Sequence, residues 1–214
     1  MVEAQLSVQG SIIYSPPQIG FWTIPSEEAN IDLSEKLLPP MTHTKALNFI
    51  SPEGFHALSM PEYFSLLFRP LYDSRSDTEA ENVRKFIESA MTRYSATLTK
   101  IIYSPTNKDT IMHYKWQKSE QTIQADIAGE DGKISKALSL EASFALTGKS
   151  PEEAKEILHY LTKKQSYIFR ITKKPRAQTE SVAGFVAYSD RAGLSCGRFP
   201  DGRGDGLGVR VHKK

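Results

Sequence analysis

Apolar residues alternate with polar ones over several short segments of the chain, which predicts β-strands. These segments are residues 5–14, 21–24, 97–104, 110–117, 122–128 and 166–172. Segments 97–104 and 110–117 are close together in the sequence, and the turn through Pro105–Asp109 between them predicts a β-hairpin. Residues 140–147 also fit the alternation and are expected to extend the sheet. The polar stretches 25–40 and 173–180 are expected to be mostly loop and linker.

Apolar residues recur at three- and four-residue spacing elsewhere, which predicts helices. The predicted helices are residues 44–50, 61–68, 80–94 and 151–161, the second ending before Pro70. Capping boxes are expected at Ser59–Glu62, Thr78–Glu81 and Ser150–Glu153, where a hydroxyl and a carboxylate three residues later bond to backbone N–H groups. Strands and helices are mixed without a regular strand–helix–strand alternation, which predicts an α+β fold.

Composition fits one ordinary domain spanning residues 1–214. The chain has 39% hydrophobic and 24% charged residues and a formal net charge of +2, so its overall field favours no class of partner. The single Cys196 excludes an internal disulfide. No apolar run has the length of a membrane span, and the N-terminus lacks a signal-peptide pattern, so we expect no membrane insertion and a cytoplasmic or virion-associated protein.

The C-terminal stretch Ser181–His212 differs from the rest of the chain in two ways. Seven of the 13 glycines lie between Gly184 and Gly208, which predicts a long irregular loop between the strand-like segments 184–188 and 207–212. The stretch also contains no Lys, Gln, Glu, Met or Trp, and its charges come from Arg and Asp alone. Aromatic and Arg residues among Ser and Gly are typical of loops that bind proteins.

The ending GFVAYSDRAGLSCGRFPDGRGDGLGVRVHKK resembles the ligand-binding end of C-type-lectin-like domains. More narrowly, it resembles the variable proteins of diversity-generating retroelements, of the archaeal or viral type. Mutagenesis directed at adenines cannot produce the five missing residue types in that family. Residues 42–67 resemble the two-helix region of such domains, and residues 97–175 have no counterpart and are interpreted as an insertion. The family's first strand pairs with its last, which places QLSVQG (5–10) beside LGVRVH (207–212).

The resemblance implies a non-enzymatic protein with a C-type-lectin-like fold and a diversified surface for a protein ligand, such as one on a cell or virus surface. The implied ligand-binding residues are Tyr188, Asp190, Arg191, Gly193, Ser195, Gly197, Phe199, Asp201, Gly202, Arg203, Gly204 and Asp205. The implied scaffold residues are Phe185, Leu194, Leu207 and Val209. The calcium signatures of lectins are absent, so no calcium-dependent sugar binding is expected.

Two other functions compete with this interpretation. The basic clusters Lys163–Lys164, Lys173–Arg176 and Lys213–Lys214 are possible phosphate contacts of a nucleic-acid-binding module, although nearby Glu residues favour a solvated face instead. Cys196 is a possible nucleophile of a small enzyme, although a buried structural thiol is the more common case. The five histidines are isolated, so we expect no metal site and no cofactor.

Overall fold

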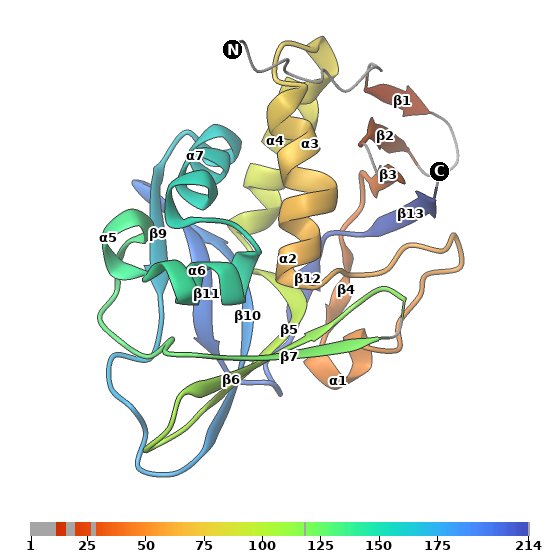
Figure 1. Cartoon of the computed structure of the whole chain (residues 1–214). Coiled ribbons are helices and arrows are strands. Elements are labelled where there is room, and N and C mark those ends of the chain that lie inside the picture. The colour runs from red at the N-terminus through yellow and green to blue at the C-terminus, as the bar shows by residue number, and fades with distance from the viewer. Residues whose placement is uncertain (1–11, 16–19, 27–28, 118, 214) are drawn as a thin grey trace.

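The structure is a computed structural model that describes residues 12–15, 20–26, 29–117 and 119–213. It contains two antiparallel-rich sheets with helices packed on one face of the larger sheet (Figure 1), which confirms the α+β class. The strands are β1 (Ile13–Ser15), β2 (Phe21–Pro25), β3 (Ala29–Ser34), β4 (Leu38–Met41), β5 (Ser95–Tyr103), β6 (Asp109–Tyr114), β7 (Glu120–Ala125), β8 (Gly132–Lys133), β9 (Gln165–Phe169), β10 (Thr179–Ala187), β11 (Arg191–Arg198), β12 (Gly204–Gly206) and β13 (Val209–Lys213). The helices are α1 (His43–Ala46), α2 (Met60–Glu62), the π-helical η1 (Tyr63–Phe68), α3 (Arg69–Asp73), α4 (Thr78–Met91), α5 (Ile134–Ala137), α6 (Leu140–Thr147) and α7 (Pro151–Thr162).

The larger sheet has the strand order β4-β12-β5-β10-β11-β9-β8, and the smaller has the order β1-β2-β3-β13. Strand β6 pairs with β5 in antiparallel register, with Thr99 opposite His113, and β7 pairs with β6. The predicted hairpin over 97–104 and 110–117 is therefore confirmed. Residues 97–175 supply the central strand β5 as well as this hairpin; that they form an insertion stays a prediction.

The prediction that residues 25–40 are mostly loop is wrong, because this stretch forms β3 and most of β4. Strand β3 pairs antiparallel with β13, with Val209 opposite Leu33 and Lys213 opposite Ala29. The last strand therefore does have a partner from the N-terminal part of the chain, but the partner is 29–34. The segment expected in that role, residues 5–10, lies outside the described residues, as does most of the predicted strand 5–14.

The stretch 140–147 was expected as a strand and is helix α6, so this prediction is wrong. Ser139 begins the helix, because its hydroxyl accepts from the backbone N–H of Ala142 at 3.1 Å. Gly148 ends it in the left-handed conformation, with a φ of +69° that favours glycine. The apolar residues buried by α6 are Ala142, Ala145 and Leu146, which have helical rather than alternating spacing.

Local capping signals place the other helices. The capping boxes at Ser59–Glu62 and Ser150–Glu153 are both present. Helix α4 begins at Thr78, two residues before the expected start at residue 80. The capping box expected at Thr78–Glu81 is wrong, because Asp77 caps the helix and accepts from the N–H of Glu79 at 2.9 Å. The helical segment after Ser59 also continues past Pro70 to Asp73, because Pro70 lies in the first turn of α3, where its missing N–H costs no hydrogen bond.

The predicted long irregular loop between residues 188 and 207 is wrong, because most of this stretch forms β11 and β12. None of its glycines has a positive φ. Close packing requires some of them instead: a Cβ on Gly184 would lie 2.6 Å from the carbonyl oxygen of Ser95, and one on Gly193 would overlap the carbonyl oxygen of Tyr167. Glycine enrichment here indicates close backbone approach within a sheet.

The core lies between the larger sheet and helices η1, α3, α4, α6 and α7. The four predicted scaffold residues, Phe185, Leu194, Leu207 and Val209, are completely buried there, which confirms that expectation. Phe185 contacts the ring of Phe68 with centroids 5.0 Å apart, so strand β10 is tied directly to the helical layer. Within the described ranges, no helix combines the length and apolarity that a membrane crossing requires.

Candidate binding surface along strand β11

Strand β11 lies between β10 and β9, and its alternate residues face opposite sides of the larger sheet. Leu194 is paired with Phe185 and faces the helices. The neighbouring residues Arg191, Gly193 and Ser195 therefore face away from them, on the side behind the sheet as drawn in Figure 1. The pairing of β10 and β11 becomes irregular beyond Ser195, and Gly197 is exposed there. The predicted contact residues thus follow one sheet face lined by small side chains.

An aromatic cluster lies at the start of β11 on this outward face. It is here called the tyrosine end and consists of Tyr167, Phe169, Tyr188, Asp190 and Arg191. Tyr188 is 52% exposed and packs edge-on against Phe169, with ring centroids 5.2 Å apart. The guanidinium of Arg191 lies 5.2 Å from the centroid of the Tyr167 ring and 5.8 Å from that of Phe169. Asp190 is exposed in the turn between β10 and β11. Arginine stacked on half-exposed aromatic rings is a typical anchor of protein interfaces.

The second end, here called the phenylalanine end, is the loop 199–203 with Arg198 and Tyr94. Phe199 is 71% exposed, the most exposed of the large apolar side chains that the structure describes. Arg198 lies 4.2 Å above the ring of Tyr94 and donates from Nη2 to the carbonyl oxygen of Arg203. The side chains of Asp201 and Arg203 are exposed, so this end offers an apolar ring between charges of both signs.

A narrow cavity of about 20 Å³ lies beneath the phenylalanine end, large enough for about one water molecule. Its lining includes Met41, His43 and Val182. Burial, together with the nearby Lys100, lowers the pKa of His43 to about 4, so the imidazole is neutral at neutral pH. The backbone N–H of His43 donates to the carbonyl oxygen of Pro200 at 3.2 Å, which fixes the loop 199–203 over the cavity.

Three predicted contact residues do not present a side chain to solvent. Gly193 and Gly204 are buried, and a Cβ on Gly204 would lie 3.1 Å from the Cβ of Ala96. Asp205 is also buried, and its carboxylate forms an ion pair with Arg93, with Nε and Oδ2 3.0 Å apart. Gly202 is half-buried beneath Arg198. The exposed part of the predicted set is therefore Tyr188, Asp190, Gly197, Phe199, Asp201 and Arg203, with Arg191 and Ser195 half-buried.

Four side chains of this surface were not predicted from the sequence: Tyr94, Tyr167, Phe169 and Arg198. Tyr167 and Phe169 belong to β9, which pairs in parallel with β11 so that Gly193 lies opposite Tyr167. Tyr94 follows α4, where its φ of 62° turns the chain into β5, and its buried ring lies beneath Arg198. Arg198 lies within the C-terminal stretch, but that stretch carries no signal for the three aromatic partners, which come from other parts of the chain.

Comparison of the chain with protein-family models, with curated proteins and with solved structures gave no match. Function is therefore inferred from the geometry and chemistry of the molecule itself.

The basic clusters of the alternative nucleic-acid interpretation lie in separate places. Lys163 and Lys164 line an open hollow of about 760 Å³ beside Asp190, together with Lys133 and Lys155. Lys155 is paired with Glu152 at 2.8 Å and Lys164 with Glu88 at 3.2 Å, which reduces the local positive potential. The cluster Lys173–Arg176 lies in the connection between β9 and β10, where Lys174 is paired with Asp126 at 3.0 Å. Lys214 lies outside the described residues.

Cys196 is completely buried on the core side of β11, and burial raises the pKa of its thiol to about 12. A thiol needs access and a lowered pKa to act as a nucleophile, so these surroundings disfavour Cys196 in that role. The metal-ligating side chains placed by the structure (His, Cys, Asp and Glu of the described ranges) form no group of three with the spacing of an ion site.

We expect Cys196 of the native protein to react with Ellman's reagent at least about a thousandfold more slowly than in the urea-unfolded chain, since reaction requires the strand to open. Absorbance of the released thiolate measures both rates. A native rate within tenfold of the unfolded rate would mean that the thiol is accessible and would restore the enzyme alternative.

Proposed function

We propose that this chain is a non-enzymatic binding protein with a C-type-lectin-like fold, a variable protein of the diversity-generating retroelement type. Its ligand is another protein, bound along the outward face of β11 between the tyrosine end and the phenylalanine end. The observation that carries the proposal is the arrangement of this face. A strand with small outward residues separates two clusters, each with one exposed aromatic ring, Tyr188 or Phe199, near an Arg side chain that stacks on a neighbouring ring.

The dimensions of the surface support a protein rather than a small ligand. Strand β11 has eight residues, which corresponds to a length of about 23 Å between its ends. Specific protein interfaces bury about 800 Å² on each partner, so one partner covers both ends. Exposed Tyr, Phe and Arg supply the contacts that dominate such interfaces, whereas Gly197 and Ser195 leave room for the partner's own side chains.

The topology supports the resemblance to C-type-lectin-like domains. A strand of the N-terminal part, β3, pairs antiparallel with the last strand, β13. Two helical segments, Met60–Asp73 and α4, lie between β3 and the central strands. The residues that the resemblance assigns to the scaffold are buried, whereas most of those that it assigns to contact are exposed or half-buried. This division is what a diversified surface on a fixed frame requires.

A pair of display libraries tests binding by this surface. The first randomises residues 188, 190, 191, 195, 197, 199, 201 and 203, and the matched library randomises eight exposed positions of the neighbouring helices α4 and α7: 81, 82, 85, 89, 152, 155, 156 and 159. Both are selected on immobilised hen egg lysozyme. Because the β11 positions surround preformed aromatic anchors, we expect at least about tenfold more specific binders from the first library. Equal yields from the two libraries would contradict the proposal. Deleting residues 187–206 is not a usable test, since it removes a central strand.

The gene itself tests the family. We expect a near-copy of the DNA that encodes residues 181–212 to lie close to the gene, differing from it at adenines and accompanied by a reverse transcriptase gene. Sequencing of the locus in independent isolates measures both. A locus without the near-copy and the reverse transcriptase would remove the retroelement part of the proposal and leave the binding surface to be judged by the libraries.

A further inference from the structure

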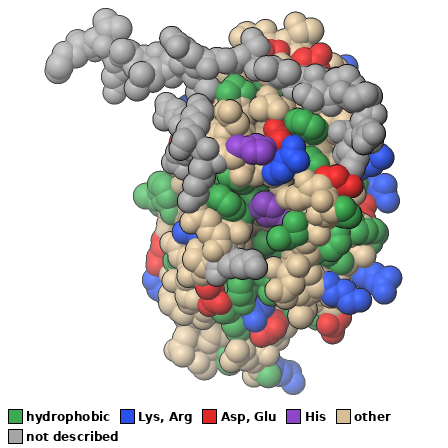
Figure 2. All heavy atoms as spheres, turned by 90° about the vertical axis from the view of Figure 1, so that its right-hand side faces the viewer, with side chains coloured by type: hydrophobic (Ala, Val, Ile, Leu, Met, Phe, Trp, Pro, Cys, Tyr) green, Lys and Arg blue, Asp and Glu red, His purple; other side chains and the backbone are tan. Residues whose placement is uncertain are grey.

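A second cavity, far larger than the one beneath Phe199, lies where the two sheets meet. It measures about 520 Å³ and is bounded by five segments: residues 46–50 from the end of α1, the strip Gly54–His56, Leu98 of β5, residues 114–116 and 119–120 at the turn from β6 to β7, and β13. Figure 2 faces this side of the molecule and shows hydrophobic side chains gathered around a histidine near the middle of the face. Cavities of 300–1,000 Å³ are the usual size for sites that bind small molecules. We call this cavity the junction pocket.

Aromatic and aliphatic side chains line most of the junction pocket. Phe49, Tyr114 and Trp116 supply the aromatic walls, and Leu47, Ile50 and Leu98 supply the aliphatic ones. Ile50 is 58% exposed, which places an unprotected apolar side chain at this pocket. Exposed apolar surface gathered in a hollow is typical of a binding site.

Hydrogen bonds hold the walls in place without a ligand. The backbone N–H of Trp116 donates to Oε1 of Glu62 at 3.2 Å, and the other oxygen of Glu62 completes the capping box with Ser59. On the opposite side, His56 and Val209 exchange backbone hydrogen bonds of 3.0 and 2.9 Å. The walls are therefore fixed by the fold, which removes the entropy cost of forming the site when a ligand binds.

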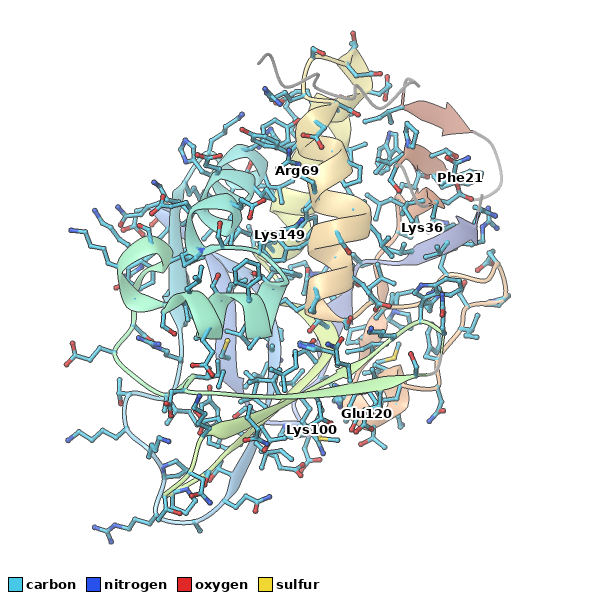
Figure 3. The ribbon with its side chains drawn as sticks, viewed as in Figure 1. Phe21, Lys36, Arg69, Lys100, Glu120 and Lys149 are labelled. Atoms are coloured by element: carbon cyan, nitrogen blue, oxygen red, sulfur yellow. The ribbon has the colours of Figure 1, made fainter. Side chains whose placement is uncertain are left out.

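The polar groups of the pocket lie in positions that leave its centre uncharged. The ring of His56 lies 6.4 Å from that of Trp116, tilted by 31°, and burial lowers the pKa of His56, so the imidazole is neutral at neutral pH. Arg210 is held at one side by Asp32, at 2.7 Å, and by the rings of Phe21 and Phe55. Lys115 and Glu120 are exposed and carry opposite charges; Figure 3 labels Glu120 at the start of β7 and Phe21 in the smaller sheet.

We propose that the junction pocket binds a small flat aromatic molecule of about two fused rings. The rings lie between Trp116, Tyr114 and Phe49, and a polar substituent at the ring edge lies toward Lys115 and Glu120. Aromatic rings prefer tilted or offset contacts with other rings, which walls at several inclinations provide. This site is separate from the β11 surface, so a negative result for one proposal does not affect the other.

The probe is 2-naphthol, a neutral two-ring molecule with one hydroxyl, titrated into the full-length protein and followed by its fluorescence and by quenching of tryptophan emission. We expect one bound molecule per chain. Trp116→Ala should raise the Kd at least about tenfold, because it removes an aromatic wall. Ile50→Glu should raise it at least about fivefold by placing a charge at an apolar contact, and since Ile50 is exposed this variant retains the fold.

Phe144→Ala is the matched control, because Phe144 is a large apolar side chain on α6 that is 48% exposed and lies outside the pocket lining. Its Kd should stay within about twofold of the unchanged protein. The proposal is overturned if 2-naphthol does not bind up to its solubility limit. It is also overturned if the probe binds with the same Kd to Trp116→Ala, Ile50→Glu and the control.

Discussion

Replacing Gly193 by alanine is expected to lower the free energy of unfolding by about 3 kcal/mol or more, since the added methyl group is forced into neighbouring backbone. A Cβ at this position overlaps the carbonyl oxygen of Tyr167 and lies 2.9 Å from the backbone nitrogen of the same residue. Relief requires strands β9 and β11 to move apart, and their parallel pairing holds the tyrosine end together. Urea denaturation followed by circular dichroism measures the loss.

Gly197→Ala is the matched control on the same strand. The nearest atom to a Cβ on Gly197 is the carbonyl carbon of Arg170 at 4.0 Å, an ordinary contact distance. We expect its free energy of unfolding to stay within about 0.5 kcal/mol of the unchanged protein. If both variants lose the same stability, close packing is not the reason for glycine at 193. If the prediction holds, position 193 is part of the frame and cannot belong to a diversified set.

Asp32→Ala is expected to lower the free energy of unfolding by about 2–3 kcal/mol, because it removes a buried carboxylate that accepts charge-assisted hydrogen bonds from partly exposed partners. The side chain of Asp32 is 5% exposed and joins β2, β3 and β13. It accepts from Oγ1 of Thr23 at 2.7 Å and from Nε and Nη2 of Arg210 at 3.0 and 2.7 Å, and His212 Nε2 lies 2.7 Å away. Asp190→Ala, which removes an exposed carboxylate, is the control and should change stability by less than about 0.5 kcal/mol.

The carboxylate of Asp32 also determines the direction in which the free energy of unfolding changes with pH. Burial alone would raise the pKa of Asp32, but hydrogen bonds from Thr23, Arg210 and His212 lower it below its ordinary value of 3.8. A lowered folded-state pKa means that the stabilisation is present above pH 3.8 and is lost as the pH falls through the lower, folded value. The stability difference between the unchanged protein and Asp32→Ala should therefore shrink at acid pH. A difference that grows on acidification would contradict this assignment.

Features with local causes were predictable from the sequence. The capping boxes at Ser59 and Ser150 and the hairpin after Ser95 depend on residues a few positions apart, and all three are present. The helical structure of residues 140–147 was not predictable, because their apolar residues fit alternating and helical spacing equally well. The helix is set by Ser139 and Gly148 at its ends, outside the segment itself.

Features with distant causes were not predictable. Strand β3 contains polar Asn30 and Asp32, and it lies between β2, which precedes it directly, and β13, which follows almost 180 residues later. The glycines between 184 and 208 indicated that the backbone is unusual there. Their local sequence does not show whether glycine is needed for a positive φ or for the close approach of a neighbouring strand. The aromatic partners of the tyrosine end come from β9, and only the parallel pairing of β9 with β11 brings them to Tyr188.

The position of the C-terminal strands has a consequence for synthesis of the protein. Strands β11 and β12 each insert between two strands made earlier, with β12 between β4 and β5 and β11 between β10 and β9, and β10 pairs with the earlier strand β5. A nascent chain therefore exposes the unpaired edges of β4, β5 and β9 until residues 179–206 leave the ribosome, and such edges favour aggregation. The larger sheet is complete only after these strands have been made, so the segment with the most unusual composition is also the one that decides whether each newly made copy folds.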